Sequence, residues 1–273
     1  MRRRVFATVF AVMLVGMLVW ASPSSADHKP GHGGGGNGGG NGGGKPTTTT
    51  TVPGSTTTTA APTTTTATAA PTTTTTAAPS GKDPILFVHG WNSSGSIWNT
   101  MISRFQSDGW TNAELHNWSY NTNQSNATTA SEISALVDQI LAQTGKAKVD
   151  IITHSMGGLS SRWYAKFLGG DTKVDEWVSL GGPNHGTDIA YFCFSTSCSE
   201  MRPGSSFLDD LNAGDETPGS PRYGTWWSPC DSVINPDSSV SLSGATNTQT
   251  ACLGHSDLYT DATVYGQVRT FVQ

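Results

Sequence analysis

The sequence predicts an α/β fold in which a parallel sheet carries helices on both faces. Segments of strand length alternate four times with segments of helical spacing, the pattern of consecutive strand–helix units. The first of these strand segments, 84–88, is a continuous apolar run, as strands covered on both faces are. Residues 81–273 supply 193 residues for this fold, which is enough for one domain with its own core.

Two segments precede this domain. Residues 1–26 begin Met-Arg-Arg-Arg, continue with an apolar run and end with small residues, the three parts of a secretory signal peptide cleaved after Ala26. The run is shorter than the roughly 20 residues of a membrane-spanning helix, so an uncleaved anchor is the weaker interpretation. Residues 27–80 are Gly-rich and then Thr/Pro-rich, which is typical of a disordered linker or stalk. We therefore expect a secreted protein, which the linker could attach to the cell wall.

The first half of the domain contains two expected strands and two expected helices. The apolar run 84–88 is a buried strand, and a helix with apolar positions 98, 101, 102 and 105 follows it. A second strand is expected near 113–118. The clearest helix then begins at a capping box, Thr129-Ala-Ser-Glu132, and ends at Gly145.

The second half continues the alternation and then loses it. A third strand at 148–153 leads directly into a helix at 157–168, and a fourth strand follows at 174–180. After Pro183 the pattern becomes loop-rich to about residue 222. The last expected elements are two strands and a closing helix, at 223–227, 248–253 and 257–272.

Charge and cysteine content limit the partners of the domain. Residues 81–273 carry 10 Lys and Arg against 19 Asp and Glu, and this net charge of −9 argues against nucleic acid and anionic membranes. Four cysteines in an exported domain indicate two disulfides, for which three pairings exist. We expect Cys193–Cys198 and Cys230–Cys252, since each joins neighbours in chain order. The alternative is a zinc site, but no Cys-x-x-Cys pair is present, so no metal is expected.

A candidate nucleophile lies in the segment Thr153-His-Ser-Met-Gly-Gly158. It joins an expected strand to an expected helix with no spare residues, so the residue at its apex, Ser155, is forced into a strained conformation with an exposed side chain. Gly157 and Gly158 supply the small residues that such a turn needs. An ordinary strand–helix loop is the alternative interpretation, but the strand–turn–helix context favours a nucleophile.

A nucleophilic serine needs a histidine base, which follows it in the chain in this topology. Only His185 and His255 come after Ser155. His255 lies between the last expected strand and the last helix, from where it could reach back over the sheet. His185 lies just after the fourth strand and fits better as a loop-shaping residue, so we expect His255 to be the base.

The acid that orients the base is expected to be Asp231. It follows the fifth strand and therefore lies at the same edge of the sheet as Ser155 and His255. Asp237 is the closest alternative, although a turn residue after a proline is its simpler interpretation. The expected Cys230–Cys252 bridge would tie the loops of acid and base together, so its reduction should lower both activity and stability.

A tetrahedral intermediate needs two N–H donors for its oxyanion. Met156, directly after the nucleophile, should supply one of them. Trp91 should supply the other, because Gly90 in the loop after the first strand lets the Trp91 N–H turn inward. A His-Gly pair after a strand is also a common turn, but its occurrence together with the Ser155 motif favours an oxyanion hole.

With these residues in place, the domain resembles the compact secreted triacylglycerol lipases and esterases of bacteria. The matching pieces, spread over 84–273, are Phe87-Val-His-Gly90, Thr153-His-Ser-Met-Gly-Gly158, Leu180-Gly-Gly-Pro-Asn-His-Gly-Thr187 and Leu253-Gly-His255. The resemblance implies a minimal, mostly parallel six-stranded α/β-hydrolase fold and ester hydrolysis through an acyl-enzyme, with Ser155, Asp231 and His255 as the triad. Thr153 departs from the family, which usually has Gly or Ala there, and should displace the turn slightly.

The resemblance also implies the partners of the domain. These are an ester or acylglycerol substrate and a lipid–water interface, with no cofactor and with a monomeric enzyme. The insertion 188–222 matches less well, and a lid over the site is one interpretation of it. An acyltransferase, amidase or peptidase could use the same triad. A non-catalytic module that binds wall or host glycans is an alternative of another class, against which an intact triad argues.

Overall fold

The computed structural model describes residues 81–273. Their six strands form one sheet in the order β2-β1-β3-β4-β5-β6, and every neighbouring pair is parallel. The predicted α/β fold is therefore confirmed. The predicted signal peptide and linker, residues 1–80, lie outside the described residues. The strands are β1 (Ile85–Val88), β2 (Leu115–Asn117), β3 (Val149–His154), β4 (Val174–Leu180), β5 (Arg222–Trp227) and β6 (Thr246–Gln249).

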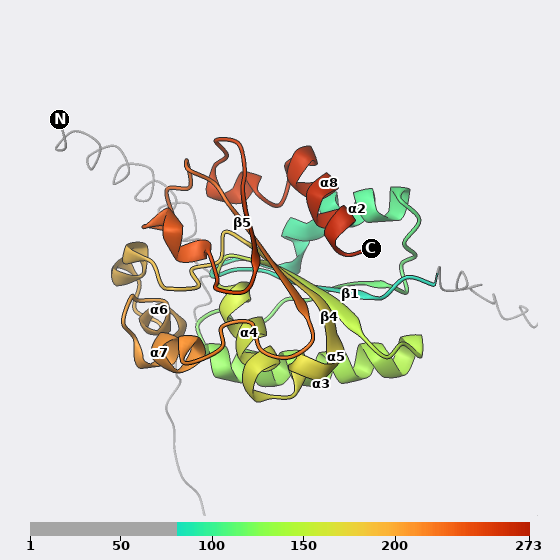
Figure 1. The fold of residues 1–273 in the computed structure, drawn as a ribbon, viewed down its shortest axis with the longest axis horizontal. Coiled ribbons are helices and arrows are strands. Elements are labelled where there is room, and N and C mark those ends of the chain that lie inside the picture. The colour runs from blue at the N-terminus through green and yellow to red at the C-terminus, as the bar shows by residue number, and fades with distance from the viewer. Residues whose placement is uncertain (1–80) are drawn as a thin grey trace, which may run out of the picture. The chain divides into compact units, whose positions relative to one another are not determined.

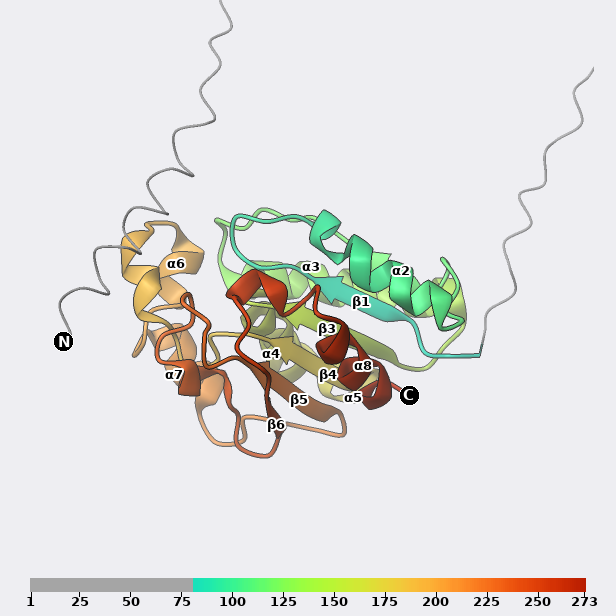
Figure 2. The same ribbon diagram turned by 90° about the horizontal axis from the view of Figure 1, so that it is seen from above.

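Helices cover both faces of the sheet. Figures 1 and 2 show α2 and α8 on one face and α3, α4 and α5 on the other, while α6 and α7 lie beyond the ends of the strands. Among residues 81–273 no helix is long and apolar enough to cross a membrane. The helices are α2 (Asn99–Ser107), α3 (Asn126–Thr144), α4 (Gly157–Phe167), α5 (Gly170–Lys173), α6 (Thr196–Glu200), α7 (Ser206–Asn212) and α8 (Ala262–Phe271). Short 3₁₀ turns are η1 (Gly95–Trp98), η2 (Asp188–Phe192), η3 (Asp237–Val240) and η4 (His255–Asp257).

The core has two layers, one on each face of the sheet. Ile85 and Phe87 of β1 pack with residues of α2 and α8, whereas Leu86 and Val88 pack with residues of α3 and α4. Side chains of a strand alternate between the two faces of the sheet. Both faces can therefore be apolar only if every residue of the strand is apolar. This arrangement explains why β1 appears in the sequence as a continuous apolar run.

The start of α3 differs from the prediction. The helix begins at Asn126, and the Ser125 side chain accepts the Ala127 N–H at 3.2 Å, so the expected capping box at Thr129 is wrong. A carboxylate distant in the chain explains the difference. Glu200 of α6 accepts the Asn126 N–H at 2.7 Å and the Ser125 hydroxyl at 2.6 Å. A negative charge at a helix N-terminus is stabilising, and a local sequence pattern cannot reveal one that arrives from another helix.

The last two elements are shorter than predicted. Strand β6 ends at Gln249, and a last hydrogen bond joins the Thr250 N–H to the Trp227 carbonyl at 2.8 Å. Beyond it the chain leaves the strand pairing, and the Leu253 N–H donates to the Ser228 side chain. Helix α8 begins at Ala262, where the Asp261 side chain accepts the Val264 N–H at 2.9 Å. The predicted strand to 253 and the predicted helix from 257 therefore both extended too far into the loop between them.

Candidate active site

Ser155 occupies a tight turn between β3 and α4. Its φ of +55° lies in the left-handed region, which is uncommon for a residue with a side chain. The main chain holds it there on both sides. The Ser155 N–H donates to the Leu180 carbonyl at 2.9 Å, and the Ser155 carbonyl accepts the Gly158 N–H at 3.0 Å. The strained conformation predicted for this position is therefore present, at the carboxyl end of the central strands. The predicted exposure is wrong: Ser155 is only 9% exposed, because the loop after β1 lies against its side chain.

Two glycines allow the chain to pack closely around this turn. A Cβ on Gly157 would lie 2.5 Å from the Val88 carbonyl oxygen, so α4 could not approach β1 as it does with any other residue. A Cβ on Gly90 would lie 2.7 Å from the Cβ of Ser155. The loop after β1 thus lies directly against the serine.

Thr153 is accommodated within β3. It is fully buried, and its hydroxyl donates to the Val178 carbonyl on the neighbouring strand β4 at 2.8 Å. This hydrogen bond satisfies the polar group that a Gly or Ala would lack. The tight turn that follows is retained with the larger residue in place.

Asp231 and His255 form a hydrogen-bonded pair. The Oδ2 of Asp231 lies 2.7 Å from the Nδ1 of His255, and the two side chains are only 2% and 11% exposed. Because a carboxylate only accepts, this nitrogen carries the proton and Nε2 is left to accept one. The second carboxylate oxygen accepts the N–H groups of Val233 and Ile234, at 2.8 and 3.1 Å. These contacts hold the acid in one fixed orientation.

The pair lies at the same edge of the sheet as the serine. The His255 ring is 4.5 Å from the ring of His154, the residue before Ser155. Gly181, at the end of β4, has φ +58°, and a Cβ there would lie 3.2 Å from both Asp231 Oδ2 and His255 Cε1. The ends of β3, β4 and β5 therefore bring the three predicted triad residues into one region.

The alternative acid and base lie in other surroundings. His185 contacts Glu216 through Nε2 at 2.7 Å and the Ser239 carbonyl through Nδ1 at 3.2 Å. It thus joins two loops, as expected of a loop-shaping residue. Asp237 is the first residue of η3, in the turn that follows Pro236.

The cysteines pair as their chain order predicts, Cys193 with Cys198 and Cys230 with Cys252. The second disulfide connects the residue before Asp231 with a residue three positions before His255. It therefore links the loop of the acid to the loop of the base.

Among residues 81–273, no group of three or more His, Cys, Asp and Glu side chains is placed to hold a metal ion.

Ser228, which was not predicted from the sequence, connects the same two loops. It follows β5 and is fully buried. Its hydroxyl oxygen accepts the N–H groups of Cys230 and Leu253, at 3.1 and 2.8 Å, and lies 2.7 Å from the Leu253 carbonyl, to which it donates. The one available signal was its position after a strand that precedes the candidate acid.

The two predicted oxyanion donors lie on either side of Ser155. Met156 is buried at the N-terminus of α4, where the first N–H groups of a helix have no partner within the helix. Trp91 follows Gly90 in the loop that contacts the serine. This loop is fixed by Tyr120, which stacks on the His89 ring at 4.3 Å and donates its hydroxyl to the His89 carbonyl at 2.6 Å. Burial lowers the pKa of His89, which favours its neutral form.

The insertion 188–222 covers the N-terminus of α4. It contains η2, α6 and α7, which Figure 2 places beyond the carboxyl ends of the strands. Apolar residues of the insertion pack against Met156 and Leu159 of the turn and of α4. The insertion is therefore part of the wall of the candidate site.

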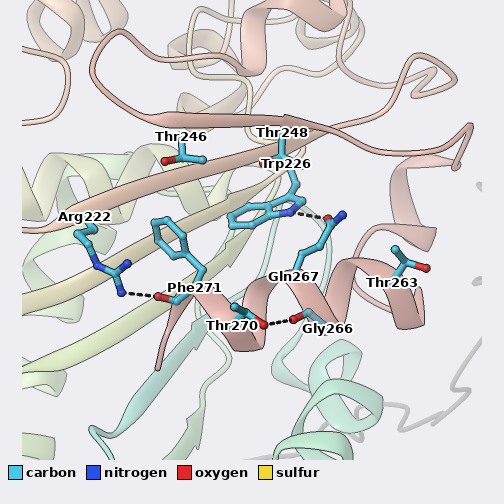
Figure 3. Close-up of a pocket in the computed structure, with 9 residues that line it drawn as sticks. All are labelled: Arg222, Trp226, Thr246, Thr248, Thr263, Gly266, Gln267, Thr270 and Phe271. Atoms are coloured by element: carbon cyan, nitrogen blue, oxygen red, sulfur yellow. Dashed lines mark hydrogen bonds between the residues drawn. The ribbon is translucent and has the colours of Figure 1, made fainter.

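A groove of about 570 Å³ lies elsewhere, between α8 and the β5–β6 edge of the sheet (Figure 3). Threonines of β6 and α8 line it, together with Trp226 and Gln267. The indole N–H of Trp226 already donates to the Gln267 side chain at 2.9 Å. None of the predicted catalytic residues lines this groove, so it is separate from the candidate active site.

A parallel sheet, a serine at a strained strand–helix turn and an Asp–His pair at the same edge together define an α/β-hydrolase. The chain belongs to the class 2 lipase family, whose model matches residues 82–268. A second model, that of the New glue protein family, matches residues 1–92, most of which precede the described part of the chain.

Solved structures support the fold. The mature form of lipase BlEst2 from Bacillus licheniformis superposes with a TM-score of 0.65 at 18% identity, over 71% of this chain and 94% of that one. Lipase B from Aspergillus fumigatus superposes with a TM-score of 0.60 at 17% identity, over 68% of this chain and 51% of that one.

Curated relatives match a shorter part of the chain. Triacylglycerol lipases of Pseudarthrobacter phenanthrenivorans and Burkholderia plantarii are each 39% identical over 61 residues, which is 22% of this chain. The matched segment spans 18% and 16% of the length of these two relatives.

Proposed function

We propose that this protein is a secreted serine hydrolase of carboxylic esters, with Ser155, His255 and Asp231 as its triad. One observation carries the proposal: a serine held at φ +55° lies at the same sheet edge as a buried Asp–His pair 2.7 Å apart. A serine held at a tight strand–helix turn and an oriented imidazole are the two requirements of nucleophilic acyl transfer. Membership of the lipase family supports the same chemistry.

In the first half of the reaction, the Ser155 oxygen attacks the ester carbonyl carbon while Nε2 of His255 takes the hydroxyl proton. The carbonyl oxygen becomes an oxyanion, which the N–H groups of Met156 and Trp91 stabilise. Asp231 stabilises the imidazolium that forms. His255 then donates its proton to the leaving alkoxide of the ester. The alcohol departs, and the acyl group remains bound to Ser155 as an acyl-enzyme.

In the second half, water replaces the alcohol. His255 removes a proton from the water as its oxygen attacks the acyl carbon. Collapse of the second tetrahedral intermediate breaks the bond to Ser155, which recovers the proton from His255. The carboxylic acid is released, and the enzyme returns to its starting state.

Hydrolysis of p-nitrophenyl esters from acetate to palmitate tests this proposal, with the full chain and its Ser155→Ala variant. Turnover by the wild type should fall by about 10⁶-fold in the variant, because the nucleophile is lost while the fold is kept. The dependence on chain length then places the enzyme between esterases and lipases. Equal turnover by both proteins, or none by a folded wild type, would refute the proposal.

We further propose that a lipid–water interface is a partner of the enzyme, and that the enzyme acts as a monomer. Five large hydrophobic side chains of the described residues are exposed, and three of them lie in one segment, the aromatic loop 191–194. Tyr191, Phe192 and Phe194 are 53, 61 and 88% exposed. The Cys193–Cys198 disulfide holds this loop, and Cys193 packs against the cluster that contains Met156. An exposed apolar patch beside an active site suits contact with lipid, and a domain with net charge −9 suits neutral acylglycerols.

A double substitution in the aromatic loop tests the interfacial contact. Tyr191→Ser with Phe194→Ser should lower hydrolysis of emulsified tributyrin about tenfold and leave hydrolysis of dissolved p-nitrophenyl acetate within twofold. Phe167→Ser is the matched control, since Phe167 is also exposed but lies at the far end of α4. An equal loss on both substrates would contradict the contact. Light scattering that gives a dimeric mass would contradict the monomer.

A further inference from the structure

His154, the residue before Ser155, lies in contact with the segment that carries His255. Its Nε2 is 3.0 Å from the His255 carbonyl oxygen. Because a carbonyl oxygen only accepts, this nitrogen must carry a proton and donate it. The ring also lies 4.5 Å from the ring of His255 and meets Tyr259 edge-on at 4.8 Å. With 5% of its surface exposed, His154 belongs to the interior of the site.

Three other bonds of this segment lead to the loop after β5. The Cys252 sulfur is joined to Cys230, the Leu253 N–H donates to Ser228, and the His255 ring donates to Asp231. They orient the base with respect to its acid. Within residues 81–273, the hydrogen bond from His154 is the one that joins the main chain of His255 to the β3–α4 turn.

We infer that His154 is a positioning residue that sets the distance between the His255 base and the Ser155 nucleophile. The inference rests on the function proposed above. Adjacent residues carry the nucleophile and the donor that holds the main chain of the base, so a shift of one is transmitted to the other. Proton transfer from serine to imidazole requires hydrogen-bond distance, and a displacement of about 1 Å can cost about 100-fold in rate.

The charge of His154 suits this role. Burial is the main cause that lowers its pKa, and the nearby His255 and His89 rings lower it further. The titratable groups around it are His255 and Tyr259 in the following loop and His89 at the end of β1. A neutral His154 ring can remain beside His255 when that ring takes the proton of Ser155, whereas two charged rings 4.5 Å apart would repel each other.

Two substitutions in the full chain test the inference, with p-nitrophenyl butyrate as substrate. His154→Phe fills the same space without the donor, and His154→Gln retains a side-chain N–H. The Phe variant should lose about 100-fold in kcat with KM within twofold, since binding does not use this bond. The Gln variant should recover most of that loss. A Phe variant within threefold of wild-type kcat, or a Gln variant as slow as the Phe variant, would overturn the inference.

Hydrogen exchange of the amides from Cys252 to Leu258 supplies a readout that needs no turnover. Loss of the bond should speed exchange in the Phe variant, while the Gln variant stays close to wild type. Unchanged exchange in the Phe variant would overturn the inference. A wild type that hydrolyses no ester, together with faster exchange in the Phe variant, would instead refute the proposed function and leave the positioning contact intact.

Discussion

The two ends of the sheet each bury an aspartate, but in opposite environments. At the carboxyl edge, Asp231 accepts two main-chain N–H groups and the imidazole of His255. Near the amino edge, Asp150 accepts one N–H, that of Glu176, at 3.1 Å, and lies beside the Glu176 carboxylate. At the first site, hydrogen-bond donors contact both oxygens of the carboxylate. At the second, burial and the Glu176 carboxylate raise the pKa of Asp150 well above its ordinary value.

The two aspartates therefore have different roles: Asp150 supports the fold, and Asp231 supports the proposed chemistry. Asp150 lies at an irregularity in the β3–β4 register, where β4 carries residues without a partner in β3, and its side chain satisfies a main-chain N–H there. Arg222 binds the Glu176 carboxylate at 2.6 Å across to β5. This cluster supports the sheet. The cluster around Asp231 instead orients an imidazole at an edge where the main chain is strained, so it should matter for rate more than for stability.

Between the two buried aspartates, the larger effect is expected from Asp231→Asn. The amide keeps the shape of the carboxylate, but it removes the charge and no longer selects the Nδ1–H tautomer of His255. We expect kcat for p-nitrophenyl butyrate to fall about 10⁴-fold. Asp237→Asn, in the turn at η3, should change kcat by less than twofold. A smaller loss for the first variant than for the second would assign the acid to Asp237.

The elements that the sequence predicted well are those fixed by local chemistry. The strand over 174–180 and the helix end at Gly145, whose φ is +69°, follow from apolar runs and a left-handed cap. The strained serine follows from a strand and a helix with nothing between them. Contacts distant in the chain were not predictable. Glu200 moves the start of α3, and the Ser228 hydroxyl joins two loops more than twenty residues apart.

The Cys230–Cys252 disulfide should have the next largest effect, because it connects the loops of acid and base. Replacing both cysteines with serine opens a loop of 22 residues and should lower the free energy of unfolding by about 3 kcal/mol. We also expect kcat to fall more than tenfold. The matched control is the double variant of Cys193 and Cys198, which opens a loop of five residues and should keep kcat for dissolved esters within threefold. Equal losses of kcat would show that the first disulfide has no special link to the site.

A pair of glycine-to-alanine substitutions compares the crowded turn with an open helix surface. Gly157→Ala places a methyl group 2.5 Å from a main-chain oxygen of β1 and should destabilise the fold by about 1–3 kcal/mol, with loss of activity. Gly266→Ala, inside α8, meets no atom within 4 Å and should stabilise by about 0.5–1 kcal/mol. Urea unfolding measures the change in stability of both variants. A Gly157→Ala enzyme of full stability would mean that close packing does not hold the serine.

A small gain in stability is also expected from Asp150→Asn. Since the folded-state pKa of Asp150 is raised, the native protein binds this proton more tightly than the unfolded chain does, and stability falls as the pH rises through the raised pKa. Asparagine keeps the acceptor for the Glu176 N–H but does not titrate. The variant should therefore be more stable than wild type at pH 7, by about 1 kcal/mol, with the gain shrinking toward pH 4. The activity should not change.

Asp150→Ala separates charge from hydrogen bonding, because it leaves the buried N–H unpaired and should cost about 1–3 kcal/mol. If Asp150→Asn instead destabilised the protein at pH 7, a charged Asp150 carboxylate would be stabilising near the amino edge, and the contrast between the two edges would be lost.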